Sequence, residues 1–117
     1  MRMRNAAVAG LGALVLGLTL PASPAAAATG EFRYTYSGLD GRPQTAELPD
    51  PADGECITLP EVADPASSSP AHSPRNRTDA TATVFTEPDC TGDWFTLRPL
   101  VGRGSERLKL RSVVFGD

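Results

Sequence analysis

Short stretches in which apolar and polar residues alternate recur along the chain from about residue 30 onwards. Glu31–Tyr36 places three aromatic side chains on one face of an extended segment, and Ala80–Thr86 places Ala82 and Val84 on one face. Alternation with a period of two is the pattern of a half-buried β-strand. Because no stretch after residue 28 has the sustained periodicity of a helix, the pattern predicts an all-β domain.

Turns rich in glycine and proline separate the alternating stretches. Short strands between such turns predict a small β-sandwich. We expect the fourth and fifth strands to pair as a hairpin, with Trp94 or Phe95 entering the core and Leu97 on the same face as Phe95. The six expected strands are Glu31–Tyr36, Gln44–Leu48, Cys56–Leu59, Ala80–Thr86, Trp94–Leu97 and Leu108–Phe115.

Residues 60–74 do not follow this rhythm. They contain four prolines, four serines and the only histidine, His72, and offer almost no side chains to bury. We expect a long, mobile surface connection here. Asn76-Arg77-Thr78, just after it, matches the sequon for N-glycosylation, a motif that is common by chance.

The first 28 residues have the composition of a secretory signal peptide. A basic start precedes an uncharged apolar run from Ala6 to Leu20, and Ala26-Ala27-Ala28 fits the small residues at a cleavage site. The run is shorter than the roughly 20 residues that span a bilayer, so a membrane anchor is not expected. We expect cleavage after Ala28, with Ala27 as the near alternative, and secretion of a single domain, residues 29–117.

The chain is acidic, with a formal net charge of −3 at pH 7. Removing the two arginines of the leader would make it −5, which argues against a nucleic-acid partner because phosphate binding needs a basic face. We expect a monomer that meets an unknown extracellular protein or a cell-wall component. The basic residues of the second half are interpreted first as solvated strand edges, and second as a patch for an acidic partner: Arg98, Arg103, Arg107, Lys109 and Arg111.

The chain has two cysteines, Cys56 and Cys90, and we expect them to form one disulfide in an exported protein. Its closed loop would stabilise the fold by roughly 4 kcal/mol in the chain-entropy model. A redox role would require a Cys-x-x-Cys motif or a lone reactive thiol, and the sequence has neither.

An aromatic residue followed seven positions later by glycine occurs once in each half of the domain. Tyr34 precedes Gly41, and Phe85 precedes Gly92. Each pair is followed by a serine that opens a short strand, Ser73 in the first half and Ser112 in the second. This arrangement resembles the Greek-key motif of the βγ-crystallin superfamily.

The resemblance implies a structural role for each of these residues. Phe85 would cover a folded-back turn, Gly92 would take a positive φ angle, and Ser112 would bond to backbone groups of that turn. Asp89 and Asp93 would flank it as solvated charges and turn caps. In the first half, 32 positions separate Gly41 from Ser73, against 20 between the second glycine and serine.

Three further motifs are similar to those of small secreted members found in actinobacteria. They are Asn76-Arg77-Thr78, Cys90-Thr91-Gly92 and Ser112-Val113-Val114-Phe115. The resemblance covers Tyr34 to Gly116, nearly the whole predicted domain. It implies that the fold is a sandwich of two Greek keys.

Many members of this superfamily bind calcium through acidic and hydroxyl side chains that precede the motif serine. The corresponding positions before Ser112 hold Arg107, Leu108 and Arg111, and those before Ser73 hold no carboxylate. We therefore expect both calcium sites to be lost and no cofactor to be bound. A separate acidic cluster is interpreted as a solvated face, with weak calcium binding left open: Asp50, Asp53, Glu55, Glu61 and Asp64.

An enzyme is not expected. His72 lies in the proline-bounded segment, a poor position for a catalytic base, and one histidine with two paired cysteines cannot form a zinc site. We expect a secreted binding or inhibitory module, since some members of the superfamily inhibit proteases or act as toxins. The alternative is a structural protein of the cell surface or medium without a discrete site.

Overall fold

The computed structural model describes residues 26–116, which form eight β-strands and two short 3-10 turns. The two turns are η2 (Pro60–Val62) and η3 (Pro88–Cys90), so no helix in this range could cross a membrane. The strands are β4 (Gly30–Ser37), β5 (Pro43–Pro49), β6 (Ile57–Thr58), β7 (Ala71–Thr78), β8 (Ala82–Glu87), β9 (Thr91–Leu97), β10 (Lys109–Leu110) and β11 (Ser112–Phe115).

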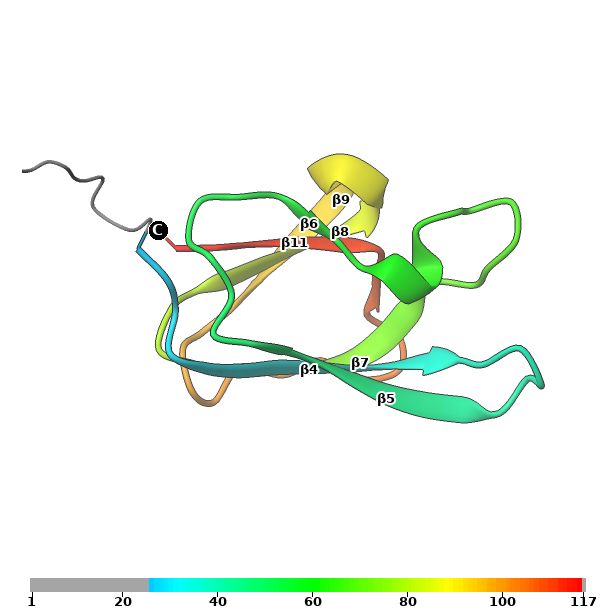
Figure 1. The fold of residues 1–117 in the computed structure, drawn as a ribbon, viewed down its shortest axis with the longest axis horizontal. Coiled ribbons are helices and arrows are strands. Elements are labelled where there is room, and N and C mark those ends of the chain that lie inside the picture. Colours follow the sequence, from blue (N-terminus) through cyan, green and yellow to red (C-terminus); the bar gives the residue numbers. More distant parts are fainter. Residues whose placement is uncertain (1–25, 117) are drawn as a thin grey trace, which may run out of the picture.

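The strands form two four-stranded antiparallel sheets that lie one above the other (Figure 1). The first sheet has the order β10-β7-β4-β5, and the second has the order β6-β11-β8-β9. Each sheet therefore takes three strands from one half of the domain and one short strand from the other half. The prediction of an all-β, sandwich-like domain is confirmed.

The core lies between the two sheets, and aromatic residues of β4 contribute much of it. Phe32 and Tyr34 are 0% and 1% exposed, and the ring of Phe32 meets that of Phe115 edge-on at 5.4 Å. This contact joins the first sheet to the second. Smaller residues fill the remaining space, among them Leu59, Val62, Ala71, Ala82, Val84, Leu97, Leu110 and Val113.

The alternation in β8 has the predicted orientation. Ala82 and Val84 are buried, whereas Thr83 and Phe85 on the other face are only partly buried. The expected hairpin partner is β9, with Val84 opposite Phe95. However, the expectation that Trp94 or Phe95 enters the core is wrong, because these side chains are 61% and 53% exposed. Since β9 is the outer strand of its sheet, only Leu97 at its end is buried.

The prediction of a surface connection over residues 60–74 is wrong at its two ends, whereas residues 63–70 lie outside the regular elements. Val62 in η2 is buried, and the segment after Pro70 is the start of β7, which pairs with β4. Pro74 fits into this strand because the register shifts there, where two residues of β7 face Tyr34 alone. Proline lacks an N–H donor, so a bulge is a position in a sheet that tolerates it.

The last expected strand, 108–115, is divided at Arg111. Lys109–Leu110 pairs with β7 in the first sheet, whereas Ser112–Phe115 pairs with β8 and β6 in the second. The backbone N–H of Arg111 donates to the carbonyl of Phe85 at the crossing point. The segment predicted as one strand therefore contributes β10 to the first sheet and β11 to the second.

Residues 1–25 of the predicted signal peptide lie outside the described residues. The end of that segment is described, and it packs against the domain. Ala28 is 2% exposed and its N–H donates to the carbonyl of Pro51, while the carbonyl of Ala26 accepts from Asp53. Cleavage after Ala28 would remove both of these hydrogen bonds.

Candidate functional site

The turn between β8 and β9 is the structural centre of the second half. The predicted disulfide is confirmed: Cys90 in η3 is bonded to Cys56, just before β6, with a Cα–Cα distance of 5.9 Å. The hydroxyl of Ser112 donates to the carbonyl of Glu87 at 2.6 Å and accepts from the N–H of Cys90 at 2.8 Å. One serine thus holds both ends of η3.

Two other residues of the second motif lie at the same turn. Gly92 has a φ of +86°, and a Cβ atom there would lie 2.4 Å from the hydroxyl oxygen of Thr86. Phe85 pairs directly with Ser112 across the β8–β11 ladder. Phe85, Gly92 and Ser112 therefore surround one folded-back turn, and the hydrogen bonds of Ser112 hold it together.

The corresponding residues of the first half do not converge in this way. Gly41 lies in the β4–β5 turn with a φ of +80°, and a Cβ there would contact nothing within 4 Å. Ser73 instead lies at the bulge of β7, where its hydroxyl is 2.8 Å from Nδ1 of His72. Tyr34 points into the core, and its hydroxyl donates to Oε1 of Glu61 at 2.6 Å. Burial, reinforced by this carboxylate, raises the pKa of Tyr34 far above its usual range.

The positions where calcium ligands were considered are occupied by other interactions. The guanidinium of Arg111, 6% exposed as a residue, donates to the carbonyl of Val62 and to the hydroxyl and carbonyl oxygens of Ser68. In the acidic cluster, Asp50 accepts from the N–H of Gly30. No group of three or more histidine, cysteine, aspartate or glutamate side chains suited to a metal occurs within residues 26–116.

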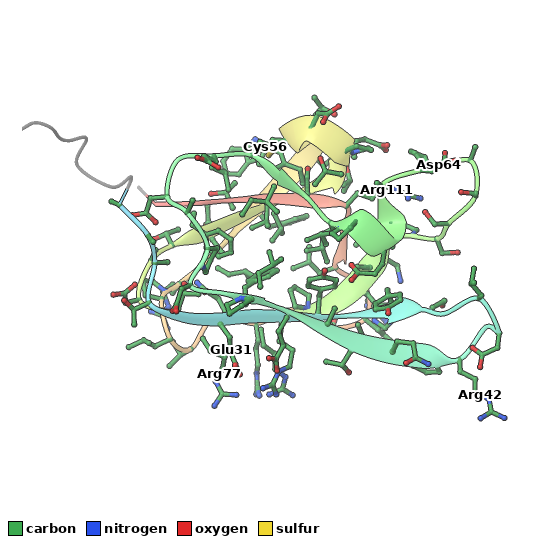
Figure 2. The ribbon with its side chains drawn as sticks, viewed as in Figure 1. Glu31, Arg42, Cys56, Asp64, Arg77 and Arg111 are labelled. Carbon is green, nitrogen blue, oxygen red and sulfur yellow. A yellow bond between two sulfur atoms is a disulfide. The ribbon has the colours of Figure 1, made fainter. Side chains whose placement is uncertain are left out.

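A hollow lies on the outer face of the first sheet, beside β7. It has a volume of about 460 Å³, and we call it the arginine groove. Figure 2 shows Arg77 projecting from this face, away from the second sheet. The groove is lined by Arg75, Arg77, Leu100, Val101, Gly102 and Arg103.

Hydrogen-bond register places two of these arginines directly opposite each other. Arg75 bridges Arg103, while the N–H of Asn76 donates to Gly102 and the N–H of Gly104 donates to Pro74. The hydrogen bonds thus join the neighbours of Arg75 and Arg103 and not these two residues themselves. This is the non-hydrogen-bonded type of antiparallel pair, in which the Cα atoms are about 4.5 Å apart. Two guanidinium side chains therefore start from neighbouring points on the same face.

The arginines of this face differ in how their charge is balanced. Arg33, opposite Arg75 on β4, forms ion pairs with Glu31 and Glu47 at 2.5 and 2.9 Å. By contrast, the three exposed arginines of the groove form no ion pair with any residue in the described part of the chain. A cluster of three arginines without a direct ion pair therefore lies on the surface of a chain whose net charge is negative.

A buried amide fixes the loop that carries one wall of the groove. Asn76, fully buried, donates from Nδ2 to the carbonyls of Leu97 and Arg98 at 3.1 and 3.0 Å. The N–H of Leu100 donates to the carbonyl of Thr78, which adds a second attachment. This burial also makes the sequon at Asn76 inaccessible to a glycosyltransferase in the folded protein.

Arg103 is among the basic residues that the sequence suggests for an acidic partner, whereas Arg75 and Arg77 are not. One local signal was present, since Arg75-Asn76-Arg77-Thr78 alternates between charged and small polar residues. With Asn76 and Thr78 inward, both arginines must face outward. The local pattern could not predict that Arg103 lies close to Arg75, because their contact depends on a bridge between residues far apart in the chain.

Comparisons with known proteins add no family to these observations. No family model matches the chain, and no curated protein or solved structure matches it either.

Proposed function

We propose that this protein is a secreted, non-enzymatic binding module that captures an anionic extracellular partner through the arginine groove. The observation that carries the proposal is the cluster of Arg75, Arg77 and Arg103, three exposed cations without an ion-pair partner among residues 26–116. The partner would be an extracellular protein or a cell-wall component with negative charge. We retain the expectations that the module is a monomer and has no cofactor.

The electrostatics of the groove favour binding of an anion. Like charges directly opposite each other on neighbouring strands destabilise a sheet, so the bridge between Arg75 and Arg103 has a cost in the free protein. An anion placed between them would remove that repulsion. Arginine also offers a planar fork of donors that matches carboxylate and phosphate oxygens, so binding gains directional hydrogen bonds as well as charge neutralisation.

Two features support secretion and the Greek-key interpretation. A disulfide is typical of proteins in oxidising compartments, which agrees with the predicted signal peptide. The exchange of one short strand between the two halves, β6 and β10, is what two intertwined Greek keys would require. We therefore propose that the domain is a βγ-crystallin-like sandwich whose second motif is regular and whose first is modified.

A groove-specific capture experiment tests the proposed function. The immobilised protein would be exposed to cell-wall fractions and culture fluid, in parallel with the double variant Arg75→Gln/Arg103→Gln. The matched control is Arg42→Gln/Arg107→Gln, which removes the same charge at exposed positions outside the groove. We expect salt-sensitive capture by the wild type and the control but not by the groove variant.

Equal capture by all three proteins, or by none, would contradict a function of the groove. The second outcome would favour the structural alternative, a surface protein without a discrete site.

A second candidate function, inhibition of a protease, is favoured by the loop over residues 60–70. Residues 63–67 are exposed, and the turn within them is held by Asp64, whose carboxylate accepts from Ala66 N–H and Ser67 Oγ. Arg111 fixes the base of the loop through Val62 and Ser68. An inhibitory loop must be exposed and rigid; this segment is exposed, and the hydrogen bonds of Asp64 and Arg111 support the rigidity that the proposal requires.

Limited proteolysis separates this candidate from a passive loop. We expect the wild-type loop to resist cleavage, and the variant Arg111→Gln to be cut within residues 63–67 while the sheets remain folded by circular dichroism. Titration against a panel of proteases then tests inhibition itself. Rapid cleavage of the wild-type loop without loss of protease activity would eliminate this function.

A further inference from the structure

We infer that the ligand group recognised by the arginine groove is a phosphate monoester attached to an apolar moiety. This inference rests on the proposed function, because it specifies the chemistry of the same site. It starts from the geometry of the Arg75–Arg103 pair. A carboxylate carries one negative charge on two oxygens, and the fork of a single arginine matches it fully, so a second guanidinium would gain less from it.

A phosphate monoester matches the paired arginines better than a carboxylate does. It has three terminal oxygens and a charge near −2 above its second pKa of about 6, so it can accept from two forks at once. Arg77 follows two residues after Arg75 on the same face, at a spacing of about 6.8 Å along the strand. A third cation therefore lies beside the pair. A phosphodiester has fewer terminal oxygens and only one negative charge, so it would bind more weakly.

The loop that carries Arg103 also places two apolar side chains in the groove. Leu100 and Val101 are 61% and 67% exposed, and they lie in the same hollow as the three arginines. Backbone hydrogen bonds hold this loop, from Leu100 N–H to Thr78 and from Gly102 N–H to Arg98. An ordered apolar surface next to a cationic pair fits a ligand that has both parts.

Carboxylates near the groove do not occupy the arginines. Glu31 lies opposite Arg77 in the β4–β7 ladder, but its carboxylate is bonded to Arg33. Asp79, close to the end of β7, accepts from the N–H of Thr29. The cationic cluster is thus left for an external anion.

Three small probes test this inference on the full domain: phenyl phosphate, inorganic phosphate and benzoate. Binding would be followed by isothermal calorimetry and by NMR chemical shifts of the backbone around Arg75 and Arg103. We expect phenyl phosphate to bind about tenfold or more tightly than benzoate, since at least one additional charge-assisted bond forms. The affinity for phenyl phosphate should fall between pH 7.5 and pH 5, as the second phosphate proton returns.

Variants assign the two parts of the ligand to the arginine pair and to the apolar residues of the loop. Arg75→Gln/Arg103→Gln should lower phenyl phosphate affinity about tenfold or more, whereas Arg42→Gln/Arg107→Gln should change it less than about twofold. Leu100→Ser/Val101→Ser should reduce phenyl phosphate to the affinity of inorganic phosphate. A phosphoserine peptide and its unphosphorylated form then distinguish a protein-borne monoester from the free ion.

Equal affinities for benzoate and phenyl phosphate, or shifts that map away from the groove, would overturn the inference. If groove-dependent capture of a natural partner persists in that case, the proposed function stands and only the ligand chemistry is wrong. If capture is also independent of the groove, both fail.

Discussion

Replacing Asn76 with leucine tests whether one buried amide holds the loop that completes the arginine groove. Its Nδ2 donates to the carbonyl oxygens of Ala80, Leu97 and Arg98 at 2.8, 3.1 and 3.0 Å. Its Oδ1 accepts from the N–H and the hydroxyl of Thr78 at 3.1 and 2.7 Å. Leucine has nearly the same shape but cannot donate or accept, so the substitution removes these contacts without leaving a cavity.

The expected loss of stability follows from these bonds. A hydrogen bond contributes about 0.5–1.5 kcal/mol net, and a buried polar group left unpaired costs about 1–3 kcal/mol. Some groups keep a partner, since the carbonyl of Arg98 still accepts from Gly102 at 3.0 Å. We therefore expect a loss of about 3–5 kcal/mol in the free energy of unfolding, a large part of the 5–15 kcal/mol typical of a domain.

Urea unfolding followed by circular dichroism measures this change directly. The control is Gln44→Leu, which replaces an exposed amide of β5 and should alter stability by less than about 0.5 kcal/mol. The midpoint of the Asn76→Leu variant should fall with an unchanged dependence on urea. A difference from wild type below about 1 kcal/mol would refute the assignment of Asn76 as the anchor of the loop.

Three other predictions concern single positions. Gly92 and Gly41 both have positive φ angles, but only a Cβ at Gly92 would collide with a neighbour, Thr86. We expect Gly41→Ala to cost about 1–2 kcal/mol in urea unfolding and Gly92→Ala clearly more, so equal losses would contradict the role of the turn. The raised pKa of Tyr34 means that the folded state keeps a proton that the unfolded chain releases above its usual pKa of 10.0. The contribution of Tyr34 to the free energy of unfolding should therefore be fully present below about pH 10 and decrease above it. In melting curves from pH 8 to pH 11, Tyr34→Phe should reduce this decrease. Finally, Arg103→Gln should raise the free energy of unfolding by about 0.2–1 kcal/mol in low salt without added anion, and less in high salt. A loss of stability would show that the pair is not repulsive.

The parts of the fold that the sequence predicted are those in which apolar residues mark the inward face. β4 and β8 have this property, with Phe32 and Tyr34 in one and Ala82 and Val84 in the other. β7 does not, because Asn76 and Thr78 occupy inward positions where an apolar residue would be expected. These polar groups can be buried because a distant loop supplies their partners, and such a loop leaves no signal in the local pattern.

The arginine groove was beyond prediction for a related reason. Arg75 lies in β7, whereas Arg103 lies in a segment without regular secondary structure. A single isolated bridge brings the two residues together. Sequence alternation gives the direction of a side chain within one strand, but not which strand lies beside it. The exposure of Trp94 has the same origin, since β9 becomes an edge strand only through the order of the whole sheet.

The strand that carries the proposed recognition residues also builds the part of the core that positions them. In β7 the outward side chains of Arg75 and Arg77 alternate with the inward side chains of Asn76 and Thr78. The inward residues bond to the loop that carries Arg103, so the spacing of the cations is set from inside the sandwich. Surface contacts between the arginines contribute nothing to holding them. Neutralising the arginines should therefore abolish binding without unfolding the domain, whereas changing Asn76 should disturb both.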